Sequence, residues 1–305
     1  MNGLVIKSTG SNYTVEQENG MIINCKIRGT FRLKGIDATN PIAVGDKIVF
    51  EVQDESTGYI TKIADRKNYI VRKSKKLSKQ SQIIAANIDR AFLVVTLMLP
   101  KTSTGFIDRF LITAEAYSIP VTILFNKSDL FDEDALNFQK ELAALYEPLG
   151  YPCYLISSFN KNDVAKIKSL MKGKVNLFSG HSGVGKSTLI NAIEPTLKIR
   201  TAKISLKHFK GIHTTTFAEM HKLSEGGYII DTPGIREFGM YDFSKNEVSH
   251  YFPEMRALFN KCQFDNCLHI NEPNCAVKKA VEEGKINPSR YYNYLSVIEG
   301  EDIFK

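Results

Sequence analysis

The order of two nucleotide-binding motifs constrains the fold of this chain more than any other feature. An Asn-Lys-Ser-Asp motif at residues 126–129, of the kind that reads a guanine base, precedes a G-x-x-x-x-G-K-S phosphate loop at residues 180–187. In ordinary small GTPases the base-reading motif follows the phosphate loop. The sequence therefore predicts a complete guanine-nucleotide site on a chain whose parts occur in a circularly permuted order.

The phosphate loop has the flanks that its chemistry needs. A short apolar stretch at residues 175–178 predicts a buried strand before the loop, and residues 187–193 predict the first turns of a helix after it. A strand, a glycine-rich loop and a helix N-terminus together form an anion site, and these flanks disfavour a chance glycine-rich turn. Lys186 is expected to reach the β- and γ-phosphates, and the Ser187 hydroxyl to bind Mg²⁺. The predicted phosphate-binding residues are Gly180, His181, Ser182, Gly183, Val184, Gly185, Lys186, Ser187 and Thr188.

The base-reading motif ends an apolar strand predicted at residues 121–125. A carboxylate at Asp129 can accept hydrogen bonds from N1–H and the exocyclic amine of guanine, whereas adenine offers neither donor there. This residue predicts GTP rather than ATP. The base-contacting residues are expected to be Asn126, Lys127, Ser128 and Asp129, with Ser157 and Ser158 backing the base after the apolar stretch 153–156. On its own, the serine pair would not indicate a nucleotide site.

A third motif, Asp-Thr-Pro-Gly, begins at Asp231 after the apolar residues 228–230. Asp231 is expected to hold Mg²⁺ through water, and the Gly234 N–H to meet the γ-phosphate. The motif is also ordinary turn chemistry. Its position about fifty residues beyond the phosphate loop, a normal separation for these two parts, favours the nucleotide role.

A switch segment is predicted between the phosphate loop and Asp231. One hydroxyl of Thr214, Thr215 and Thr216 is expected to bind Mg²⁺ while the γ-phosphate is present, and Thr215 is taken as that ligand. A solvated threonine run is the alternative. Ras-like enzymes place a water-orienting Gln after the glycine of the third motif, but this chain has Ile235. His213 is the nearest candidate for that role, against the alternative of a structural histidine, and intrinsic turnover should be slow.

Composition and charge set the outer limits. The 305 residues are enough for two or three domains, and no apolar stretch reaches membrane-spanning length. The first residues carry no basic-then-apolar signal, so we expect a cytoplasmic protein without a membrane partner. The formal net charge of +7 is uneven, with acid-free basic stretches at residues 72–79 and 200–213. Such stretches are often only solvated surface, but their positions favour a phosphate-rich partner.

The N-terminal residues differ in character from the rest. Five short stretches rich in Val, Ile and Tyr at 4–6, 13–15, 21–23, 47–52 and 59–63 predict a small OB-like β-barrel. Such barrels bind RNA on a basic and aromatic face. Candidates for that face are Tyr13, Phe31 and Tyr59 with Lys26, Arg28, Arg32 and Lys34. The alternative, a structural barrel with core aromatics, is favoured for any single aromatic residue.

The middle of the chain alternates apolar stretches with helical ones, which is typical of a parallel sheet covered by helices. Helices are expected at 134–146 and 163–171, and a buried strand at 91–99. The C-terminal part contains a Cys and His cluster that suits a closed, structural Zn²⁺ site rather than a disulfide. Its predicted ligands are Cys262, Cys267, His269 and Cys275. Cys25 and Cys153 lie within expected strands and are interpreted as core thiols.

Together these motifs resemble the RsgA (YjeQ) family of circularly permuted GTPases, and the likeness covers nearly the whole chain. The resemblance implies an OB-like barrel at residues 1–67, a permuted α/β P-loop GTPase domain at 68–240 and a small helical zinc-binding module at 241–305. It implies a GTPase that uses GTP, GDP and Mg²⁺, is stimulated by the 30S ribosomal subunit, contacts 16S rRNA and dissociates after hydrolysis. It carries the catalytic role onto His213, nucleotide contacts onto residues 126–129 and 180–188, and zinc onto the cysteine cluster. Two features depart from the pattern common in the family. No basic extension precedes the first strand, and Ile212 stands directly before His213, where members often have a basic residue.

Two other functions remain as alternatives at this point. One is a nucleotide-gated RNA-binding protein in which hydrolysis is incidental. The other, an ATPase or nucleotide kinase, conflicts with Asp129. We expect a monomer.

Overall fold

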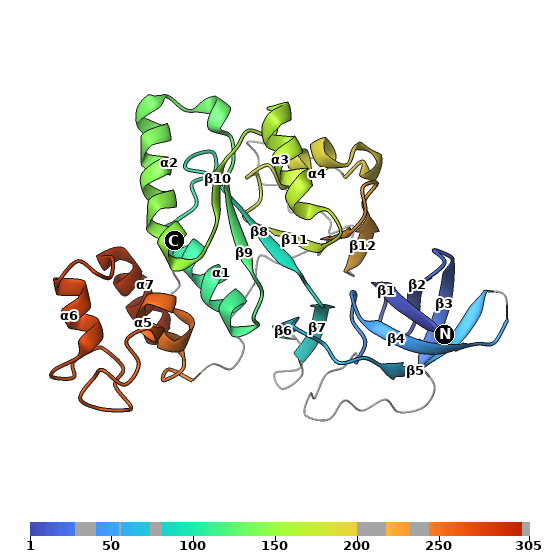
Figure 1. Ribbon diagram of the computed structural model, residues 1–305, viewed down its shortest axis with the longest axis horizontal. Coiled ribbons are helices and arrows are strands. Elements are labelled where there is room, and N and C mark those ends of the chain that lie inside the picture. Colours follow the sequence, from blue (N-terminus) through green and yellow to red (C-terminus); the bar gives the residue numbers. More distant parts are fainter. Residues whose placement is uncertain (28–40, 55, 74–80, 200–217, 232–243, 301–305) are drawn as a thin grey trace.

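The structure, a computed structural model, describes residues 1–27, 41–54, 56–73, 81–199, 218–231 and 244–300. Figure 1 shows a small β-barrel at one end, an α/β body in the middle and a group of short helices on the other side. The domain boundaries expected at 67/68 and 240/241 stay predictions, and the second lies outside the described residues. In the described part, no helix is both long and apolar enough to cross a bilayer.

The N-terminal strands close into a barrel, as predicted. They are β1 (Asn2–Ser8), β2 (Tyr13–Gln17), β3 (Ile22–Ile27), β4 (Lys47–Val52) and β5 (Thr57–Ile63). They pair in the order β1-β2-β3-β5-β4, and β4 returns to β1, which leaves no open edge. In β3 and β4 buried and exposed residues alternate at first, so one face of each strand fills the interior.

One aromatic predicted for an RNA-binding face is instead part of the barrel core. The Tyr13 ring is fully buried, and its hydroxyl donates to the carbonyl oxygen of Gly10 at 3.1 Å. The prediction for Tyr13 is wrong because closing a small barrel buries its largest apolar rings. Tyr59 is half-buried and Lys26 is exposed, whereas residues 28–40 lie outside the described part. Cys25 is buried, as expected for a core thiol.

The middle of the chain forms a parallel sheet. Its strands are β8 (Arg90–Val95), β9 (Val121–Phe125), β10 (Cys153–Leu155), β11 (Val175–Ser179) and β13 (Tyr228–Asp231). They lie in the order β10-β9-β8-β11-β13, and every pair is parallel. β11, which leads into the phosphate loop, is the fourth of these five strands along the chain, and it lies between β8 and β13 in the sheet. The strand of the base-reading motif, β9, precedes it in the chain, as the permuted motif order predicts.

Helices cover both faces of this sheet. One face packs against α1 (Thr104–Ala116) and α2 (Glu133–Tyr146), and the other against α3 (Lys161–Met171) and α4 (Lys186–Ile193). Successive residues of β8 point to opposite faces, so Leu93 joins the first core and Val94 the second. The helices predicted at 134–146, 163–171 and 187–193 are confirmed to within two residues at their starts.

The strand expected at 91–99 is too long. β8 ends at Val95, and Met98 and Leu99 are exposed. The chain leaves the sheet at Thr96, whose N–H donates to the Thr102 hydroxyl oxygen at 3.2 Å rather than to another strand. An apolar run alone does not mark where a strand ends.

An antiparallel strand joins the sheet to the barrel. β12 (Glu219–Lys222) pairs with β13 on one side and with β1 on the other, through Lys7 and Glu219. A separate hairpin, β6 (Tyr69–Lys73) and β7 (Ser81–Ala86), lies between the barrel and the α/β body along the chain. The sheet of the α/β body and the barrel thus form one hydrogen-bonded system.

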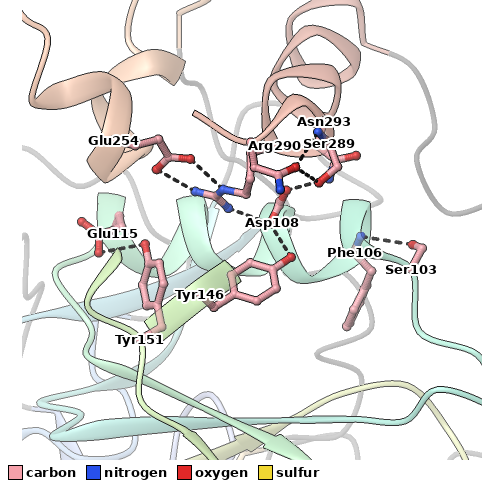
Figure 2. Close-up of polar contacts among 11 residues, drawn as sticks. Ser103, Phe106, Asp108, Glu115, Tyr146, Tyr151, Glu254, Ser289, Arg290 and Asn293 are labelled. Atoms are coloured by element: carbon pink, nitrogen blue, oxygen red, sulfur yellow. Dashed lines mark hydrogen bonds and ion pairs between the residues drawn. The ribbon is translucent and has the colours of Figure 1, made fainter. Parts of the chain in front are cut away.

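The C-terminal helices pack on α1. They are α5 (Pro253–Arg256), α6 (Ala276–Glu282) and α7 (Pro288–Glu299). The contact is fixed by a buried ion network, in which Arg290 of α7 donates to Asp108 of α1 at 2.6 Å and to Glu254 of α5 at 2.7 Å (Figure 2). Asp108 also accepts from the Tyr146 hydroxyl and from Asn293. Because each charge in the network is partnered, it can stay buried.

Candidate nucleotide site and metal centre

The predicted nucleotide motifs lie at one edge of the parallel sheet. The base-reading motif follows β9, the serine pair follows β10, the phosphate loop follows β11, and Asp231 ends β13. All four strands run the same way, so their carboxyl ends meet where open α/β sheets bind ligands. The sheet brings together motifs that are up to about a hundred residues apart in the chain.

Two glycines of the phosphate loop are required by close contacts. A Cβ at Gly180, where φ is 139°, would lie 2.1 Å from the Val94 carbonyl oxygen. A Cβ at Gly185, where φ is 97°, would lie 2.4 Å from the side-chain nitrogen of Asn126. Any other residue would strain the backbone and push it away from these neighbours. The glycine spacing therefore lets the loop turn tightly between β11 and α4.

Asn126 connects the base-reading motif to the other two loops. Its buried side chain donates to the Val184 carbonyl oxygen at 2.9 Å and accepts from the Ser158 hydroxyl at 3.0 Å. The Ser128 N–H donates to the Ile156 carbonyl oxygen at 3.1 Å, so a backbone hydrogen bond also links the base-reading motif to the segment that leads into the serine pair. Asn126 thus ties the phosphate loop to the loop of the serine pair.

The remaining residues of the base-reading motif lie nearer the surface. Lys127 has a left-handed backbone conformation, and its ammonium donates to the Leu99 carbonyl oxygen. Partial burial lowers the pKa of Lys127. Asp129 is exposed, whereas Ser157 and Ser158 are buried. The carboxylate that would select guanine therefore stands at the rim of the site.

The side chain of Lys186 folds back onto the phosphate loop, and its expected contact with the phosphates stays a prediction. Its ammonium donates to the carbonyl oxygens of Gly180 at 2.5 Å and His181 at 2.7 Å, so the cation is held over the loop. Ser187 and Thr188 are half-buried in the first turn of α4. The N–H groups at that end of a helix favour an anion.

The loop after β8 is a part of this site that the sequence did not predict. The ring of Phe106 lies 3.8 Å from that of His181, centroid to centroid, and Pro100 lies closest to Gly183. This loop therefore borders the phosphate loop from the side of α1. The Ser103 side chain caps α1 by accepting from the Phe106 N–H at 3.2 Å, and this capping serine is the sequence signal that could have marked the start of α1.

The switch and catalytic predictions concern residues that the structure does not describe. His213, Thr214, Thr215, Thr216 and Gly234 lie in the ranges 200–217 and 232–243. Asp231 is placed by its backbone at the end of β13, and its side chain is outside the described set. These roles remain predictions.

The predicted metal ligands come together in the C-terminal module. The ligand atoms of Cys262, Cys267, His269 and Cys275 all lie within 4.8 Å of one another. His269 Nδ1 is 3.3 Å from the Cys275 sulfur and 3.6 Å from the Cys262 sulfur. Three thiolates and one imidazole at these separations fit tetrahedral Zn²⁺.

The surroundings of the cluster hold its loop in place. Backbone N–H groups of Leu268 and Ile270 donate to Glu272, and the Tyr291 hydroxyl donates to the His269 carbonyl oxygen. Burial raises the pKa of the Cys267 thiol to about 12 and lowers the pKa of His269. A bound Zn²⁺ supplies the positive charge that keeps such thiols ionised.

Comparisons with known proteins agree with this architecture. The family model described as RsgA GTPase matches residues 63–241, and the one described as RsgA N-terminal domain matches residues 2–60. A protein of Bacteroides fragilis (strain YCH46) named small ribosomal subunit biogenesis GTPase RsgA is 56% identical over 302 residues, which cover 99% of this chain and 97% of that protein. A relative of the same name from Flavobacterium psychrophilum is 53% identical, covering 99% of this chain and 94% of its own.

Solved structures match along the whole chain as well. YjeQ from Thermotoga maritima superposes with a TM-score of 0.80 at 37% identity, covering 98% of this chain and 97% of that one. YloQ, described as a circularly permuted GTPase, gives a TM-score of 0.76 at 33% identity, covering 100% of this chain and 96% of its own.

Proposed function

The chain belongs to the RsgA family of circularly permuted GTPases, and on this premise we propose that it hydrolyses GTP in the biogenesis of the small ribosomal subunit. The observation that carries the proposal is the Asn126 junction. Asn126 bonds the loop of Val184 and the loop of Ser158, so one buried side chain aligns the phosphate end of the site with the base end. A site aligned in this way suits a nucleotide, and the Asp129 carboxylate favours guanine as its base.

We assign the steps of the reaction to residues of this chain as follows. The phosphate-loop amides and Lys186 hold the phosphates, and Asp129 selects the guanine base. Mg²⁺, which supplies charge neutralisation at the phosphates, would be held by Ser187, Thr215 and, through water, Asp231. His213 orients the attacking water, and the Gly234 N–H contacts the γ-phosphate. The cluster of Cys262, Cys267, His269 and Cys275 would hold one structural Zn²⁺.

The partner in this proposal is the 30S subunit, contacted through its 16S rRNA by a monomer in the cytoplasm. The names of the relatives, the net charge of +7 and the basic stretches 72–79 and 200–213 support a partner rich in phosphate. Tyr59 and the exposed Lys26 remain candidates for RNA contact on the barrel.

The junction between β13 and the barrel offers a route from nucleotide to partner. Lys222 of β12 and the Tyr228 hydroxyl of β13 both donate to Glu16 of the barrel, and β12 pairs with β1. Since Asp231 ends β13, a change at the nucleotide would act on a strand tied to the barrel. This connection supports release of the ribosomal subunit after hydrolysis.

Co-sedimentation with purified 30S subunits tests the proposal. Binding should be strong with a non-hydrolysable GTP analogue and weak with GDP, while 50S subunits should carry down little protein in either state. Equal binding to both subunits, or binding indifferent to the nucleotide, would contradict it.

A further inference from the structure

An exposed aromatic ring borders the base end of the site. Phe159 directly follows the serine pair, and 79% of its surface is exposed. A cavity of about 580 Å³ lies beside it, within the range of ligand pockets. The described residues that line the cavity are Ser128, Asp129, Leu136, Lys140, Leu155, Ser157, Phe159 and Asn160. Phe159 is the one aromatic among them.

The backbone under this ring is held firmly. The Phe159 N–H donates to the Ser157 hydroxyl at 3.2 Å, and the Asn160 N–H donates to the Ser157 carbonyl oxygen at 3.0 Å. The Asn160 side chain in turn caps α3 by accepting from the N–H of Asn162 at 2.9 Å. The ring therefore projects from a fixed turn rather than from a loose loop.

A ring beside Asp129 would strengthen the discrimination between bases by its carboxylate. A carboxylate in water discriminates weakly between bases, because water replaces any hydrogen bond that the wrong base fails to make. Asp129 is exposed in this structure. An aromatic surface laid on the base would exclude that water and would add stacking energy, since every purine has a flat π-face.

We propose that Phe159 stacks on the guanine base and shields the hydrogen bonds between the base and Asp129 from water. This inference rests on the proposed guanine-nucleotide function and adds a residue to it. Phe138 of α2 provides the contrast, because its ring is also 50% exposed but does not line the cavity.

Equilibrium binding of GDP tests the proposal. Phe159→Ala should weaken GDP binding by about 5- to 50-fold, in line with the loss of one stacked base. Phe159→Tyr should retain most of the affinity, and Phe138→Ala should match the wild type. Inorganic tripolyphosphate, which has no base, should bind Phe159→Ala as well as it binds the wild type, because the phosphate loop is untouched.

The lack of tryptophan in this chain allows a second, direct readout. In the Phe159→Trp variant GDP should quench the emission of the single tryptophan by stacking, and tripolyphosphate should not. The Phe138→Trp variant should not respond to GDP. Wild-type affinity in Phe159→Ala, or emission in Phe159→Trp that ignores GDP, would overturn the stacking role while the GTPase function stands.

Two further outcomes separate the inference from its premise. A loss of 30S binding in Phe159→Ala at unchanged GDP affinity would overturn it and assign the ring to the ribosome. A wild-type protein that binds no guanine nucleotide would overturn the proposed function together with the inference.

Discussion

At the scale of residues, two side chains of the base-reading loop differ in burial and in the role that we propose for each. Asn126 is buried and holds three loops together, whereas Asp129 is exposed at the rim and is available to a ligand. Both residues belong to the same four-residue motif, Asn-Lys-Ser-Asp at 126–129. The buried Asn126 fixes the positions of the loops, and the exposed Asp129 carboxylate is accessible for the base contact that we propose.

We expect Asp129→Asn to weaken GTP binding by roughly 10- to 100-fold, since a hydrogen-bonded charge is lost. The amide can donate where the carboxylate could only accept, so affinity for xanthosine triphosphate should rise. Competition binding against labelled GDP measures both changes, with the exposed Asp134→Asn of α2 as the control. Unchanged preference for GTP would show that Asp129 does not read the base.

His213→Ala tests the catalytic role that the resemblance gives to this residue. Hydrolysis of GTP on 30S subunits should fall by about 10²- to 10⁴-fold, the usual contribution of a positioned acid–base group, while GTP affinity stays within threefold. Single-turnover hydrolysis and equilibrium binding provide the two numbers. Normal subunit maturation without hydrolysis would favour a nucleotide-gated binding protein instead.

Single residues also mark the limits of prediction from this sequence. The phosphate loop and the metal ligands were predictable, because their chemistry demands particular residues at fixed spacing. The contact of Phe106 with His181 and the burial of Tyr13 were not, because they depend on tertiary packing. The sequence alone does not distinguish an aromatic residue that fills a core from one that faces a ligand.

At the scale of elements, α1 carries the C-terminal module. Among the described residues, two ion pairs link them, the buried Arg290–Asp108 pair at 2.6 Å and the more exposed Arg256–Glu115 pair at 2.9 Å. Figure 2 shows Asp108 on α1 beneath Arg290. Neither pair was predictable from the sequence, because the members of each lie more than a hundred residues apart.

Replacing the two arginines separately should give very different results. Arg290→Met leaves Asp108 charged and buried, which should lower the free energy of unfolding by about 3–5 kcal/mol. Arg256→Met removes a solvent-exposed pair and should cost about 1 kcal/mol or less. Urea denaturation followed by circular dichroism measures both. Similar losses in the two variants would mean that the buried network does not hold the module in place.

Removing the metal should act on the C-terminal helices and spare the nucleotide site. The Cys275 sulfur accepts from the Lys278 N–H at the start of α6, so the cluster also caps a helix. We propose one Zn²⁺ per chain at this cluster, so Cys267→Ser should abolish zinc binding and lower helicity, while GDP affinity is retained. Metal analysis measures the zinc content of this variant, with Cys153→Ala in the sheet as the control. A zinc content in Cys267→Ser equal to that of the control would contradict the assignment.

At the scale of the whole molecule, one hydrogen-bonded sheet runs from the base-reading loop to the barrel (Figure 1). The permuted order was predictable from the motifs, and so was the barrel from its five apolar stretches. The pairing of β12 with β1 was not predictable, because β12 is short and pairs across a distance of more than two hundred residues. The route that we propose from nucleotide to partner therefore depends on a strand pairing that exists only in the assembled fold.

The rate of GTP hydrolysis with and without purified 30S subunits tests the central claim most directly. Ile235 stands where a water-orienting Gln is usual, so we predict slow turnover alone, strong stimulation by 30S subunits, and none by 50S subunits or with ATP as substrate. An intrinsic rate that 30S subunits leave unchanged, or ATP hydrolysed as well as GTP, would contradict the account.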